Sequence, residues 1–102
     1  MNVKLFAASV SAALMLASMM PAMAYTGHEL ATHAKVSIAE ARAIALKAYS
    51  GKVTDEELEK EKGGSGLRYS FDIKRGGATQ EVGVDAQTGK VLENAKEGPH
   101  PD

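Results

Sequence analysis

The 102-residue chain has no cysteine and no tryptophan, and its aromatic residues are three tyrosines and two phenylalanines. Without cysteine, the chain forms no disulfide and carries no lipoprotein anchor. Neither sign of charge is in large excess, and a formal net charge of −1 argues against nucleic acid as a partner. A chain of this length forms one domain with a small core, which leaves hardly any room for a deep catalytic pocket.

The first 24 residues have the pattern of a secretory signal peptide. Lys4 supplies a positive charge, residues 5–20 form an apolar tract, and residues 21–24 (PAMA) end in a small-x-small cleavage motif. An uncleaved membrane anchor is the alternative, but serines interrupt the tract, which is shorter than the ~20 apolar residues that a spanning helix needs. We therefore predict cleavage between Ala24 and Tyr25, no stable membrane insertion afterwards, and a periplasmic or secreted location.

Two polar segments flank the regularly patterned region. Residues 25–35 are weakly periodic and are predicted to be a lead-in, either one or two helical turns or a mobile stretch. Residues 96–102 are polar, contain two prolines, and are predicted to be a disordered tail.

A helix is predicted over residues 38–50. Ser37 and Glu40 have the spacing of a capping box, in which each side chain accepts a hydrogen bond from the backbone N–H of the other. Gly51 is predicted to be the left-handed cap that ends the helix. Apolar residues recur at helical spacing and form one stripe, rich in alanine, that permits a close approach to a sheet: Ile38, Ala41, Ile44, Ala45, Ala48 and Tyr49.

Three further segments have strand patterning. Apolar and polar residues alternate strictly over 67–74, which predicts a half-buried strand. Gly76-Gly77 predicts a tight hairpin, because glycine takes positive φ at both central turn positions without steric strain. Residues 79–85 alternate likewise, and the turn 85–89 (DAQTG) leads into a last strand over 90–94.

Residues 52–62 give conflicting signals. Their content of Glu, Lys and Leu favours a helix by intrinsic propensity. Leu58, however, is the only large apolar residue after Val53, so a helix would have almost no face to bury, and the dense charge suits an edge strand. The residues alone support helix and strand equally.

Several stretches together resemble the PepSY domain family, and they span residues 36–95. These are residues 37–46 (SIAEARAIAL), residues 51–53 (GKV), the strand 67–73 and the run 84–92 (VDAQTGKVL), of which the last is the most specific. The resemblance implies a cystatin-like α+β fold, in which one main helix packs on a four-stranded antiparallel meander. It favours the strand for residues 52–62.

The resemblance also implies a function. PepSY domains occur in the propeptides of thermolysin-like metalloproteases and as small exported proteins, with a proposed role in inhibiting or modulating proteases. The family offers no catalytic residues and no cofactor to carry over, so we expect a protein-binding module rather than an enzyme. No protease domain follows in this sequence, so we expect inhibition to act in trans. The alternative is a small periplasmic metal- or ligand-binding protein.

Three motifs resemble ligand sites. His28 and His33 lie five residues apart, which turns the second imidazole by about 140° from the first instead of onto the same helical face as a zinc site needs. We expect both, and His100 in the tail, to be surface residues. The glycine-rich run 63–66 lacks the lysine of a phosphate loop and leads into a strand, which favours a hairpin turn over a phosphate loop. Asp55, Glu56, Glu57, Glu59 and Glu61 could form a weak cation site, but a solvated edge strand is favoured.

The polar side of the sheet is the candidate partner-binding surface. Alternation places these side chains on the face away from the helix, and nothing in the sequence is predicted to cover them. Cross-strand charge pairs on a wet surface are the simpler interpretation, and docking of a partner's extended segment is the functional one. The candidate residues are Arg68, Ser70, Asp72, Lys74, Glu81 and Asp85.

Overall fold

The computed structural model describes residues 25–98. The predicted signal peptide, with Ala24, and the last four residues, with His100, lie outside this range. Among the described residues, no helix has the length and apolar character needed to span a membrane.

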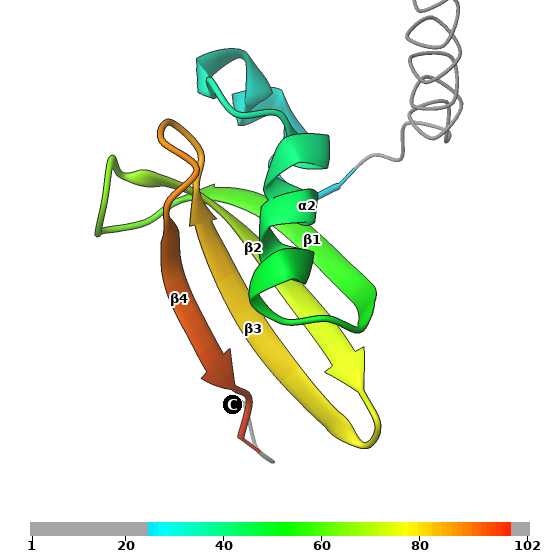
Figure 1. Cartoon of the computed structure of the whole chain (residues 1–102). Coiled ribbons are helices and arrows are strands. Elements are labelled where there is room, and N and C mark those ends of the chain that lie inside the picture. The colour runs from blue at the N-terminus through cyan, green and yellow to red at the C-terminus, as the bar shows by residue number, and fades with distance from the viewer. Residues whose placement is uncertain (1–24, 99–102) are drawn as a thin grey trace, which may run out of the picture.

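The main helix and the four strands follow one another as the sequence predicts, but the last strand extends to Lys96, so the prediction that a disordered tail begins at this residue is wrong. A 3-10 helix η1 (His28–His33) precedes the main helix α2 (Ile38–Ala48), and four strands complete the chain: β1 (Lys52–Lys60), β2 (Leu67–Arg75), β3 (Ala78–Asp85) and β4 (Val91–Lys96). The strands are antiparallel and lie side by side in sequence order, with α2 across one face (Figure 1). The predicted α+β fold, one main helix on a four-stranded antiparallel meander, is confirmed, and residues 52–60 form a strand.

Helix α2 begins with the predicted capping box. Ser37 Oγ accepts a hydrogen bond from the Glu40 amide at 3.1 Å, and Glu40 Oε1 accepts one from the Ser37 amide at 2.9 Å. The helix ends at Ala48, two residues earlier than predicted, and Tyr49 is already extended. The prediction that Gly51 is a left-handed cap is wrong, since its φ of 158° is outside that region. Gly51 instead permits close approach to β2, because a Cβ there would lie 2.5 Å from the Lys74 carbonyl oxygen.

The core lies between α2 and the sheet. Ala41 and Ala45 are fully buried on α2, and their small side chains let the helix pack closely on β2, β3 and β4. The Tyr69 hydroxyl donates a 2.7 Å hydrogen bond to the Val36 carbonyl and so ties the start of the helix to the sheet. The rest of the buried apolar cluster comes from the strands and the turn after β3: Leu58, Leu67, Tyr69, Phe71, Ile73, Val82, Val84 and Ala86.

The hairpin between β2 and β3 differs in detail from the prediction. Arg75 pairs with Ala78, so Gly76 and Gly77 are the two loop residues as expected. Only Gly76 has a positive φ, at 64°, so the prediction of positive φ at both positions is wrong. A turn with positive φ at its first central residue alone also matches the twist of the strands.

The lead-in contacts the outer edge of β1. Thr26 forms a parallel bridge to Glu57, and the Leu58 amide donates a 2.8 Å hydrogen bond to the Thr26 carbonyl. Gly27 follows with φ 85°, and a Cβ there would overlap the Leu58 carbonyl oxygen. Glycine at this position therefore lets the chain lie against β1 and then turn into η1.

Candidate functional site

The face of the sheet opposite α2 is the candidate site, and we call it the outer face. Residues paired across antiparallel strands project to the same side, so the strand register assigns its members. Its acidic members are Asp55, Glu57, Glu59, Glu61, Asp72, Glu81, Asp85, Glu93 and Glu97. The basic members are Lys52, Arg68 and Lys74, and the remaining members are Ser70, Thr79, Gly83 and Ala95.

The structure buries half of the predicted partner-binding residues. Arg68 and Ser70 are each 8% exposed and Asp85 is 1% exposed, so the prediction that this side is uncovered is wrong for these three. Asp72 and Glu81 are half-buried, and Lys74 is exposed. A partner can therefore reach only Asp72, Glu81 and Lys74 directly. Their hydrogen-bond partners come from β1, the loop after it, the turn after β3 and β4, and alternation within one strand cannot reveal these contacts.

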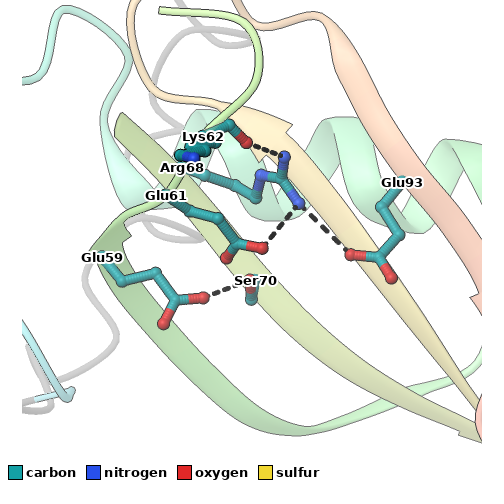
Figure 2. A network of polar contacts seen from close by, with 6 residues as sticks. All are labelled: Glu59, Glu61, Lys62, Arg68, Ser70 and Glu93. Carbon is teal, nitrogen blue, oxygen red and sulfur yellow. Dashed lines mark hydrogen bonds and ion pairs between the residues drawn. The ribbon is translucent and has the colours of Figure 1, made fainter. Parts of the chain in front are cut away.

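Arg68 is the centre of a polar network on the outer face. Its Nη1 lies 3.3 Å from Glu93 Oε1 and 3.5 Å from Glu61 Oε2. Its Nη2 donates a 3.1 Å hydrogen bond to the Lys62 carbonyl. Beside it, the Ser70 hydroxyl donates to Glu59 Oε2 at 3.1 Å (Figure 2). The guanidinium thus links β2 to β4 and to the end of β1.

Gly83 makes room for this arrangement. A Cβ on Gly83 would lie 3.0 Å from Arg68 Cδ and 3.3 Å from Glu93 Cβ, so the arginine stem passes over a residue without a side chain. Sequence reasoning did not use this glycine. The available signal was a glycine inside a strand, which often marks the close approach of another group.

We expect Gly83→Ala to displace Arg68 from Glu93 and to lower the free energy of unfolding by about 1–2 kcal/mol, as overpacking does. Urea denaturation measures the stability, and the NMR signals of the Arg68 side chain report the displacement. Gly77→Ala is the matched control, because nothing lies within 4 Å of a Cβ there and its φ is not positive. Equal stability losses in the two variants would contradict the packing role of Gly83.

Asp85 holds two turns together. Its carboxylate accepts hydrogen bonds from the Ser65 amide at 2.6 Å, the Ser65 hydroxyl at 2.9 Å, the Gln87 amide at 2.8 Å and the Thr88 amide at 3.1 Å. Burial alone would raise the pKa of Asp85, but these hydrogen bonds together lower the pKa to about 2. The side chain therefore fixes the loop before β2 against the turn after β3, and it is not available to a partner.

Three carboxyl groups of the outer face have raised pKa values. Burial is the largest cause in each, and neighbouring carboxylates add to it. Glu59 and Asp55 raise the pKa of Glu57, and Glu97 and Asp55 raise the pKa of Asp72. Glu93 and Asp72 raise the pKa of Glu81. The acidic side chains of all four strands thus act on one another across the sheet.

The acidic run of β1 is divided between the two faces. Glu56 lies on the helix side and accepts two hydrogen bonds from Arg42 of α2, at 2.5 Å from Nε and 3.0 Å from Nη2. Its neighbours Asp55 and Glu57 lie on the outer face, because a bulge between Val53 and Asp55 shifts the register.

The residues considered for metal binding lie apart in the described part of the chain. His28 and His33 are exposed on η1, as predicted. Within residues 25–98, no group of three or more His, Cys, Asp or Glu side chains is placed to hold a metal ion.

Over residues 25–98, fold and site define a small α+β domain in which one helix covers one face of a sheet and the other face is acidic. Comparison with protein families gives a match over residues 35–94 to PepSY, described as the peptidase propeptide and YPEB domain. The chain belongs to the PepSY family, as its sequence motifs predict. Searches of curated proteins and of solved structures gave no match.

Proposed function

We propose that this protein is an exported, non-catalytic PepSY domain that binds another protein and inhibits or modulates a protease in trans. The observation that carries the proposal is the family match, since it covers residues 35–94 and the family includes peptidase propeptides. The predicted signal peptide supports export, which would bring the domain together with exported proteases.

The fold offers two surfaces for a protein partner. The first is the outer face, with half-buried or exposed polar groups at Asp72, Lys74 and Glu81. The second is the outer edge of β4, which pairs with β3 on its other side and has no further strand beside it among residues 25–98. An extended segment of a partner could add there as a strand. The corresponding edge of β1 is less open, because Thr26 bridges to it.

An inhibition assay tests the proposal. Purified residues 25–102 would be titrated against a panel of exported proteases that includes a thermolysin-like metalloprotease, and mass spectrometry would follow the integrity of the added protein. We expect saturable inhibition of at least one protease while the domain stays intact. A heat-unfolded sample is the control, because it should act only as a substrate. Digestion of the folded domain without inhibition of any protease would contradict the proposal.

A further inference from the structure

Strand β1 is an edge of the sheet, and the lead-in lies along its free side. The Leu58 side chain is buried in the core at 1% exposure, while its backbone N–H points out of the sheet and donates a 2.8 Å hydrogen bond to the Thr26 carbonyl. Thr26 forms a parallel bridge to Glu57 at the same place. Residues 25–27, which we call the strap, thus pair with β1 as a very short additional strand.

Packing and one glycine hold the strap in place. Tyr25 of the strap packs against the core, as do Leu30 and Ala31 of the helix η1 that follows it. Gly27 has φ 85°, and a Cβ there would overlap the Leu58 carbonyl oxygen, so any other residue at this position would push the strap off the edge. The Leu30 amide donates a 2.8 Å hydrogen bond to the Gly27 carbonyl, so the chain leaves β1 directly after this single bridge.

Strand β4 forms the opposite edge of the sheet. The Glu97 amide, just after β4, donates a 2.8 Å hydrogen bond to the Thr79 carbonyl of β3. Backbone amides alternate between the two sides of an antiparallel strand, so the N–H groups of Asn94 and Lys96 point away from β3. Among residues 25–98, no other strand lies beside β4. The β4 edge can therefore accept a further strand, whereas the β1 edge can do so only when the strap leaves it.

The strand directions determine how two copies of the chain could join. Neighbouring strands are antiparallel throughout the sheet, so β4 of one copy and β1 of the next run antiparallel when the two copies have the same orientation. Such a contact joins two different edges and does not close into a symmetric dimer, because each added copy presents a new free edge. A domain with both edges open could thus add further copies without limit.

Side-chain charge favours this pairing over one between two β1 edges. β1 has two lysines and four acidic residues, a net charge of −2: Lys52, Lys60, Asp55, Glu56, Glu57 and Glu59. Two β1 strands side by side would therefore repel each other. β4 has one acid, Glu93, and one lysine, Lys96, and Lys90 lies just before it. The β1 edge thus meets less repulsion from β4 than from a second β1.

We propose that the strap is an intramolecular guard of the β1 edge, and that this edge takes β4 of a second copy when the strap is displaced. The Leu58 amide then donates to a β4 carbonyl of the second copy in place of the Thr26 carbonyl. The strap thereby keeps the domain from assembling into open-ended sheets. This inference does not rest on the proposed function, because the contact is between copies of this chain.

The variant Gly27→Ala of residues 25–102 tests the guard, and Gly66→Ala is its matched control. Both glycines have a positive φ, 85° and 94°, so both variants carry similar backbone strain, but nothing lies within 4 Å of a Cβ on Gly66. Hydrogen exchange followed by NMR should show the Leu58 amide exchanging roughly tenfold faster in Gly27→Ala and unchanged in Gly66→Ala. Sedimentation velocity should show species larger than a dimer, which increase with protein concentration, in Gly27→Ala alone.

Two further variants identify the partner strand and guard against misfolding. Gly27→Ala/Asn94→Pro removes an N–H from the free side of β4, where proline is tolerated, and should keep the fast Leu58 exchange but form no species larger than a dimer. The chain that begins at His28 lacks the strap and keeps Leu30 and Ala31. We expect it to assemble as Gly27→Ala does, even if Gly27→Ala folds poorly. Circular dichroism verifies that each variant is folded.

Fast exchange of the Leu58 amide without larger species, in Gly27→Ala or in the chain that begins at His28, would overturn the inference. Equal assembly of Gly66→Ala would overturn it as well, and so would larger species that persist in the Asn94→Pro double variant. Exchange of the Leu58 amide at the rate of an unprotected amide in the unmodified protein would show that the strap does not hold the edge. Because these samples contain no protease, their outcome is independent of the inhibition assay.

Discussion

The variant Asp85→Ala is expected to lose about 3–4 kcal/mol of stability. Three backbone amides and one hydroxyl lose their charged acceptor, and each interaction contributes on the order of 1 kcal/mol. The Asp85 carboxylate is 1% exposed and bonds to Ser65, Gln87 and Thr88. A domain of this size has a total stability of only about 4–11 kcal/mol, so the variant should be partly unfolded at moderate temperature. Urea denaturation measures the loss.

The pH dependence of stability separates the contribution of the Asp85 charge from the contribution of the size of its side chain. The hydrogen bonds lower the pKa of Asp85 from 3.8 to about 2 in the folded protein. A lowered pKa means that the carboxylate stabilises the fold above pH 3.8, and that this contribution is lost as the pH falls towards about 2. Asp85→Asn keeps the size of the side chain but not the charge, so its melting temperature should fall less steeply over this range.

Asp55→Asn is the control for both Asp85 variants. Asp55 is an exposed acid on β1 without an ion pair to another described residue, so its replacement should change the stability by no more than about 0.5 kcal/mol. If the melting temperature of Asp85→Asn fell with decreasing pH as steeply as that of the unmodified protein, titration of Asp85 would not be the cause of the fall. If Asp85→Ala were as stable as the Asp55 control, the carboxylate would not be holding the two turns.

Phe71→Ala is expected to destabilise the domain by about 3–5 kcal/mol, as truncation of a buried phenylalanine generally does. Phe71 is fully buried on the helix side of β2, opposite Val82 of β3, and stacks beside Tyr69 with ring centroids 6.3 Å apart. Because the core contains no tryptophan and no second phenylalanine, little else can fill the cavity. Urea denaturation followed by circular dichroism measures the effect.

Two further substitutions serve as comparisons for Phe71→Ala. Phe71→Leu keeps most of the apolar volume and should lose less than about 1.5 kcal/mol. Val91→Ala, at a position 36% exposed on β4, should have a small effect that marks the baseline for apolar truncation in this sheet. Comparable losses for Phe71→Ala and Val91→Ala would show that the centre of the core is not where the structure places it.

Much of the fold follows from short-range patterns. The capping box at Ser37 and Glu40 begins α2 where predicted, since both partners lie within one helical turn. Alternation predicts β2 and β3, because side chains in a strand project to opposite faces with a period of two. The segment 52–60 could not be decided from propensity, because its strand conformation depends on pairing with β2 and not on its own composition.

The candidate site was less predictable. Alternation correctly separates Asp72, Lys74 and Glu81 from the core side, but it does not reveal which polar groups other segments cover. Arg68 is buried because Gly83 of β3 lets its stem pass and Glu93 of β4 receives its guanidinium, 25 residues further along the chain. The same limit applies to Asp85, whose partner Ser65 lies 20 residues earlier.

The sequence by itself determined where the helix begins, which residues form β2 and β3, and which face each side chain of these strands occupies. It also determined membership of the PepSY family. Each of these results depends on neighbours in the chain or on a contiguous motif. Tertiary structure alone decided that Glu56 meets Arg42 on the helix side, that Arg68 and Asp85 are buried, and that acidic residues of all four strands share the outer face. These outcomes depend on the register between strands and on a bulge of one residue. A shift of one position moves a side chain to the other face. The two-residue loop at Gly76-Gly77 fixes the register of β2 with β3, but no such short turn fixes the pairing of β1 with β2 or the bulge in β1.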